Sequence, residues 1–120
     1  MKLGEKKSRK TVIVRFFCPY LDSEIELSEE RERHILNRHP DMPTTYHEIM
    51  ADTLADPDEV RCDLRFENTL LFSRWYPTLR KGKHIVVAVV TDTVPQERNW
   101  IVTAYIARKV TQGEVIWTRN

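Results

Sequence analysis

The chain has 120 residues, of which 41% are hydrophobic and 31% charged, and its net charge is +1. This length and apolar content suit one domain with one core, and the longest apolar run, residues 85–90, is too short to span a membrane. No signal-peptide segment follows the basic first ten residues, and two cysteines make neither a disulfide framework nor a zinc site. We therefore expect a cytoplasmic domain over residues 11–120, preceded by a disordered basic arm over residues 1–10, with no membrane partner.

The charges are distributed unevenly along the chain. Residues 1–20 carry six Lys or Arg and one acid, residues 21–60 carry three and twelve, and residues 61–120 carry ten and five. The middle of the sequence is therefore acidic, whereas the strand-rich C-terminal half is basic. Such a distribution suits a phosphate-binding face, and it is equally compatible with ordinary solvated charge.

The N-terminal part of the domain is predicted to hold a hairpin and two helices. Residues 11–17 and 24–27 have strand composition, and Ser28 is expected to cap a polar helix that stops before Pro40. A second, amphipathic helix is indicated by an apolar stripe at helical spacing. Its members are Tyr46, Ile49, Met50, Thr53 and Leu54.

The C-terminal part is predicted to consist of strands, at residues 60–65, 69–76, 84–91, 100–110 and 114–118. Residues 84–91 are apolar on both faces, which is typical of a central strand. The helices precede the main sheet instead of alternating with strands, and short turns favour antiparallel pairing. The predicted fold is therefore α+β, with two N-terminal helices packed on a twisted, mostly antiparallel sheet of four to five strands, and with an extra N-terminal strand or hairpin.

Several common site motifs are absent from the sequence. Three glycines cannot build a phosphate-binding Gly-rich loop, and the four histidines have no spacing suited to metal ligands. We therefore expect neither a metal nor a cofactor. What remains is a set of polar residues within apolar segments, and His39 is the first of them. It ends the first helix before Pro40, where an imidazole suits acid–base chemistry or merely interacts favourably with the helix C-terminus.

Three further positions join His39 as candidates, and Lys109 is a possible accessory. Arg74 shares a strand face with Phe72 and Tyr76, where it either stacks on aromatic rings or grips a phosphate. Thr103 and Tyr105 share one face of residues 100–110, and Lys109 continues that face. The opposite face, with Trp100, Val102, Ala104 and Ile106, is expected in the core.

Two residues near the end of the first helix are possible accessories. His34 lies one turn before Arg38, and it competes with His39 for the role of general base. RNA cleavage without a metal needs a base for the 2′-hydroxyl proton, an acid for the leaving oxygen and a cation for the phosphorane. A His, an Arg, a Thr and a Tyr on one sheet face would supply these groups.

The sequence also resembles a known group of proteins. The segment ELSEERERHILNRHPDM, a helix ending LADPDEV, and strands carrying FSRWYP, KHIVVAVV and WIVTAYIARK are similar to the phage- and bacteria-associated nuclease-like domains grouped with barnase, EndoU, the colicin tRNases and RelE. The resemblance covers roughly residues 27–109. It implies a metal-independent ribonuclease in which His39 is the helix-end histidine, Arg74 the cation, and Thr103 and Tyr105 the hydroxyl and aromatic groups.

Three functions remain open at this point. The first is a toxin-like endoribonuclease that cleaves RNA by transesterification through the 2′-hydroxyl. The second is a non-catalytic module that binds RNA or a protein. The third is a toxin neutralised by an antitoxin that docks near Ile116 and Trp117 at the end of the chain. Trp75 and Trp100 are expected to serve sheet packing more than nucleobase binding.

Overall fold

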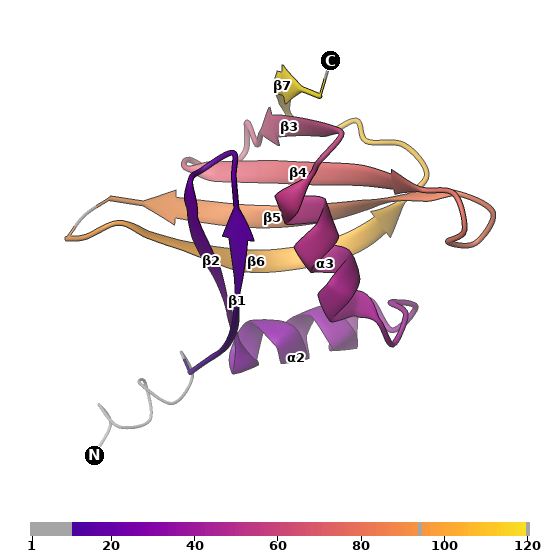
Figure 1. The fold of residues 1–120 in the computed structure, drawn as a ribbon, viewed down its shortest axis with the longest axis horizontal. Helices are drawn as coiled ribbons and strands as arrows, with labels where there is room; N and C mark the ends of the chain where they lie inside the picture. The colour runs from indigo at the N-terminus through magenta and orange to yellow at the C-terminus, as the bar shows by residue number, and fades with distance from the viewer. Residues whose placement is uncertain (1–10, 94, 120) are drawn as a thin grey trace.

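A single seven-stranded sheet, with strand order β1-β2-β6-β5-β4-β3-β7, organises the chain (Figure 1). The structure is a computed structural model that describes residues 11–93 and 95–119, so the predicted basic arm at residues 1–10 lies outside the described residues. In chain order the elements are β1 (Val12–Cys18), β2 (Ser23–Ser28), α2 (Glu29–Arg38), α3 (Tyr46–Ala55), β3 (Glu59–Cys62), β4 (Thr69–Tyr76), β5 (Lys83–Asp92), β6 (Arg98–Ala107) and β7 (Glu114–Thr118).

The predicted fold class is wrong in its sheet and in the weight it gives to helices. Helix accounts for 19% of the structure and strand for 46%, and the sheet has seven strands where four to five were expected. The N-terminal hairpin is part of this sheet, because β2 pairs in parallel with β6 at Glu26 and Trp100. The sheet is therefore mixed, although its remaining pairings are antiparallel. This parallel pairing joins segments far apart in sequence, which local residue patterns do not encode.

The inner face of the sheet holds the main core. Ile85, Val87 and Val89 of β5 are buried there against Ile25 of β2 and Met50 of α3. Figure 1 shows the β1–β2 hairpin and α3 lying side by side across this face, whereas α2 runs beside β6 at its edge. The hairpin thus covers much of the face that two helices were expected to cover.

The hairpin reaches across the inner face to the far end of the sheet. Its tip residue Tyr20 makes edge-to-face ring contacts with Phe72 of β4 and Trp117 of β7, each with ring centroids 5.9 Å apart. The sheet therefore curls around its core until the β1–β2 turn and β7 approach one another. This curvature leaves the opposite, outer face as a separate surface.

The outer face has a smaller core of its own. Leu71, Val86 and Ala88 are buried there beneath Tyr105 and Val110. Val110 belongs to the connection that carries the chain from β6 to β7, at the other side of β4 and β5 (Figure 1). Together, the two cores explain why the middle of β5 is apolar on both faces.

We expect the hairpin to be as important for folding as the helices. Ile25→Ala removes a fully buried side chain and should lower the free energy of unfolding by about 2–5 kcal/mol. Ile13→Ala is the matched control on the neighbouring strand, because Ile13 is 42% exposed, and it should cost about 0.5 kcal/mol or less. Urea denaturation of both variants measures the difference, and equal small losses would mean that the hairpin is not part of the core.

Candidate functional site

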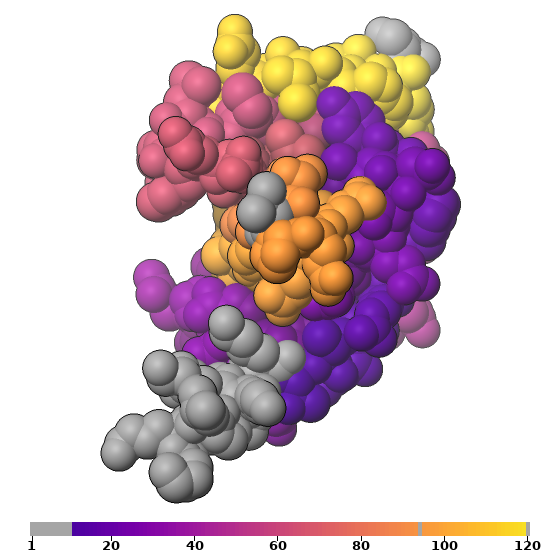
Figure 2. Space-filling view, turned by 90° about the vertical axis from the view of Figure 1, so that its left-hand side faces the viewer, coloured from indigo at the N-terminus to yellow at the C-terminus, as the bar shows by residue number. Residues whose placement is uncertain are grey.

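The outer face carries a groove of about 590 Å³. Its floor is mostly apolar and comes from β4, β5 and β6, while its rim holds charged and aromatic side chains from the β3–β4 turn. Figure 2 shows the molecule hollowed on this side between the β3–β4 turn, in rose, and α2, in purple. The lining residues are Asp63, Arg65, Phe66, Glu67, Thr69, Leu71, Ala88, Val90, Val102, Thr103 and Tyr105.

One wall of the groove is a rigid turn built on Asp63. A strand was predicted to continue to residue 65, but β3 ends at Cys62. The Asp63 carboxylate accepts hydrogen bonds from the Arg65 backbone N–H at 2.9 Å and from Arg65 Nε and Nη2 at 3.1 Å each. Asn68 closes the turn with a φ of 60°, a conformation that asparagine tolerates better than most residues.

The same turn presents a cation and an aromatic ring at the groove. The Arg65 guanidinium lies 5.3 Å from the centroid of the Phe66 ring, and Phe66 is 60% exposed. The bonds from Arg65 hold the pKa of the Asp63 carboxyl below its ordinary value of 3.8. The carboxylate is therefore charged at neutral pH, and it orients the guanidinium.

The floor of the groove is shaped by a bulge in β6. Val89 pairs with Ile101 and Ala88 with Thr103, so one additional residue, Val102, is inserted on β6. The strict alternation predicted for this strand is therefore wrong: Ile101 is fully buried, while Val102 turns to the groove. Bulges of this kind re-aim side chains and are common next to functional sites.

The bulge is held by the first helix. Arg31 of α2 donates a hydrogen bond from Nη1 to the Val102 carbonyl at 3.3 Å. The start of α2 is capped as predicted, because Ser28 Oγ accepts from the Arg31 backbone N–H at 3.1 Å. On its far side, α2 is tied to α3 through Glu32, whose carboxylate accepts from the Tyr46 hydroxyl and lies 2.8 Å from His47 Nε2.

These contacts fix the place where α2 ends, and His39 is the residue that caps it. The His39 backbone N–H donates to the Ile35 carbonyl at 2.8 Å. Its imidazole faces Tyr105, with ring centroids 5.9 Å apart and planes tilted by 34°. His39 and Tyr105, two of the predicted site residues, are therefore neighbours.

Tyr105 links the histidine to the groove. Burial raises the pKa of the Tyr105 phenol, and the Arg65 charge acts on it in the opposite direction without cancelling the rise. The phenol therefore holds its proton at neutral pH. Burial, together with the charges of Arg31 and Arg38, lowers the pKa of His34, which lies near the same helix end.

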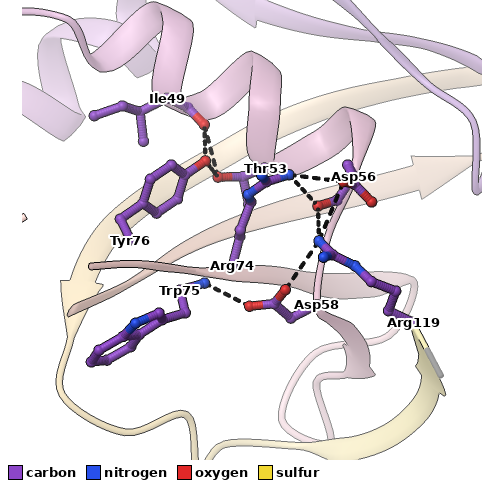
Figure 3. A network of polar contacts seen from close by, with 8 residues as sticks. All are labelled: Ile49, Thr53, Asp56, Asp58, Arg74, Trp75, Tyr76 and Arg119. Carbon is purple, nitrogen blue, oxygen red and sulfur yellow. Dashed lines mark hydrogen bonds and ion pairs between the residues drawn. The ribbon is translucent and has the colours of Figure 1, made fainter. Parts of the chain in front are cut away.

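Arg74 lies on the other face of the sheet. Figure 3 shows it with Tyr76 on one side of β4 and Trp75 on the opposite side. Arg74 Nη1 donates to the Asp56 carbonyl at 2.8 Å and to its carboxylate at 3.1 Å, and Arg119 pairs with the same carboxylate at 3.3 Å. Arg74 thus joins the end of α3 to β4, and it does not meet the other three predicted site residues.

The remaining candidates are placed around the groove with different roles. Thr103 lines it, but its Oγ1 is buried and has no hydrogen-bond partner within residues 11–93 and 95–119, so the hydroxyl is not offered to a ligand. Arg38 and Lys109 are exposed. Arg65 was not among the predicted site residues. The signal for it was the spacing Asp63-x-Arg65 before Asn68, which is typical of a turn.

Neither metal-binding clusters nor known relatives point to a further site within the described residues. Within the part of the chain that the structure describes, no three His, Cys, Asp or Glu side chains gather as metal ligands, and no helix is long and apolar enough to cross a membrane. Cys18 and Cys62 are free thiols. No protein-family model, curated protein or solved structure matches the chain, so the resemblance to nuclease-like domains stays a prediction.

The wall of the groove should be sensitive to acid through Asp63. Its pKa is depressed in the folded state, so its stabilising contribution is present above pH 4 and is lost as the pH falls through the folded-state pKa. Asp63→Asn should therefore be less stable than the wild type at pH 7, with a gap in free energy of unfolding that closes below about pH 4. Denaturation series at both pH values measure the gap. The exposed Asp52→Asn is the control, and a gap for Asp63→Asn that did not change with pH would contradict the proposed pairing.

Proposed function

We propose that the protein is a toxin-like endoribonuclease that acts without a metal ion and binds the scissile phosphate of RNA at the Tyr105 end of the outer groove. One observation carries the proposal: Arg65 and Tyr105 line the same groove, and the His39 ring lies beside Tyr105, so that groups from three separate elements are close together. An imidazole, a phenol and a guanidinium are the acid–base and cationic groups that this reaction requires.

The roles follow from the chemistry of each group. His39 takes the proton from the 2′-hydroxyl, and the freed oxygen attacks the adjacent phosphorus. The bond from phosphorus to the 5′-oxygen breaks, and Tyr105 donates its proton to that leaving oxygen. Arg65 neutralises the charge that develops on the phosphorane. The products are a 2′,3′-cyclic phosphate and a free 5′-hydroxyl, and no oxidant or cofactor is consumed.

Positive charge at one end of the sheet supports RNA as the substrate. The β4–β5 turn contributes Arg80 and Lys81, the start of β5 contributes Lys83, and the chain beyond β6 contributes Arg108 and Lys109. His84 pairs with Ala107 across β5 and β6, which brings the two groups to the same end of the sheet. We call these five residues the basic end. Phosphate contacts from Lys and Arg supply most of the non-specific affinity for nucleic acid.

The proposal includes a cytoplasmic setting, in which an antitoxin would restrain the activity. The edge strand β7 offers exposed Ile116 and Trp117 to such a partner. A module that binds RNA without cleaving it would use the same groove and the same basic end. The two functions differ only in whether His39 and Tyr105 transfer protons, so a cleavage assay separates them.

Cleavage of a labelled RNA pool in EDTA tests the proposal. We expect 2′,3′-cyclic phosphate ends from the wild type. The rate should fall about 100- to 10,000-fold in His39→Ala and Tyr105→Phe, and about 100-fold in Arg65→Gln. Arg74→Gln is the matched control, since it removes the same charge from the opposite face, and it should retain the wild-type rate per folded molecule.

Three outcomes would contradict this assignment. Undiminished cleavage in His39→Ala together with loss in His34→Gln would make His34 the base. Loss in Arg74→Gln with full activity in Arg65→Gln would move the site to the inner face. Binding of the RNA pool with no cleavage at any pH between 5 and 8 would establish the non-catalytic module instead.

A further inference from the structure

The outer face holds a second aromatic feature, away from the groove. Trp75 is 43% exposed. Its side chain lies on the side of β4 opposite the ion pairs that Arg74 makes with Asp56 and Arg119 makes with Asp58 (Figure 3). Its ring meets the His84 ring edge to face, with centroids 5.0 Å apart and planes at 66°. The exposed part of the indole leaves an aromatic surface accessible to a ligand.

The ring of Trp75 is held in place by the turn beside it. Gly82 has a φ of +104°, and a Cβ atom at this position would lie 2.4 Å from Cζ2 of Trp75. Only glycine lets the indole lie against the turn backbone, so one side of the ring rests on Gly82. The Trp75 backbone is fixed as well, because its N–H donates to Asp58 Oδ2 at 2.6 Å. The indole is therefore a preorganised platform.

The turn that supports this platform is strained and basic. Arg80 and Lys81 have φ values of 49° and 66°, directly before Gly82. Non-glycine residues in this region cost conformational energy and occur preferentially at functional sites. Lys83 Nζ folds back to the carbonyls of Arg80 and Gly82 at 2.9 and 3.2 Å, while Lys81 stays exposed. The platform therefore lies within the basic end.

We propose that Trp75, supported by Gly82 and flanked by His84, is a stacking site for one unpaired nucleobase of single-stranded RNA. This inference rests on the proposed function and adds the substrate class to it. Lys81, Arg108 and Lys109 contact the phosphates on either side of the stacked base. Stacking on an aromatic ring requires a base whose face is free, so the site selects single strands over duplexes, in which every base face is already occupied.

Tryptophan fluorescence with an uncleavable strand tests this site. The probe is an octamer of 2′-O-methyladenosine, which cannot be cleaved because its 2′-oxygen carries no proton. We expect it to quench the wild type, and its duplex with a complementary 2′-O-methyl strand to bind about tenfold or more weakly. Trp100→Phe should keep the quenching, whereas Trp75→Phe should lose most of it.

Affinity variants separate stacking from loss of fold. Trp75→Leu should weaken binding of the octamer about 5- to 100-fold, whereas Trp75→Tyr, which keeps an aromatic face, should stay within about threefold of the wild type. Lys109→Gln should lower the dependence of log Kd on log salt by about 0.7. If Trp75→Leu and Trp75→Tyr weaken binding equally, or if the duplex binds as tightly as the single strand, the stacking site is wrong.

The same data distinguish this inference from the proposed function. Quenching that depends on Trp75, in a protein that cleaves no RNA, would keep the stacking site and reject the ribonuclease. Cleavage that depends on His39 and Tyr105, with binding indifferent to Trp75, would reject the stacking site and keep the ribonuclease.

Discussion

The fold depends on burying β5 on both of its faces. Ile85, Val87 and Val89 face inward, while Val86 and Ala88 face outward, and all five are buried. A strand of this kind needs a cover on each side, because exposed apolar surface and unpaired backbone groups are both costly. Within residues 11–93 and 95–119, the two ten-residue helices do not supply enough surface for both covers. The β1–β2 hairpin therefore joins α3 on the inside, and the connection after β6 packs on the outside.

The incomplete outer cover is what creates the candidate site. Val110 and Tyr105 cover only part of the outer core, and the remaining apolar floor is bordered by the Asp63 turn and extended by the bulge at Val102. The inner core, by contrast, is covered by the hairpin and α3, and Arg74 and Arg119 pair with Asp56 at the end of α3. The inner face therefore holds the main core of the domain, whereas the outer face has an open groove.

Local patterns predicted the elements much better than their arrangement. The amphipathic stripe of α3, the Ser28 cap and the central role of residues 84–91 are confirmed, since each follows from neighbouring residues. The pairing of β2 with β6 was missed because it joins distant segments. The turn at Asp63 and the bulge at Val102 were missed because both break an alternation that continues in the sequence.

The candidate site illustrates the same limit at the level of single residues. Alternation correctly placed Arg74 with Tyr76, and Thr103 with Tyr105, on common faces of their own strands. It did not reveal that these two faces lie on opposite sides of the sheet, since the relative phase of β4 and β6 is set by their pairing with β5. A one-residue change in register would exchange the faces. In the proposed site, Arg65 is assigned the role that the sequence had suggested for Arg74.

The central claim is that the outer face is the functional one, and an NMR titration tests it most directly. ¹⁵N-labelled protein would be titrated with the uncleavable 2′-O-methyl octamer while backbone amide shifts are recorded. We predict shifts for Arg65, Thr103 and Tyr105, with little change at Ile49, Asp56 and Arg119 on the inner side. Shifts concentrated at Ile49, Asp56 and Arg119, with the groove residues unmoved, would contradict this claim.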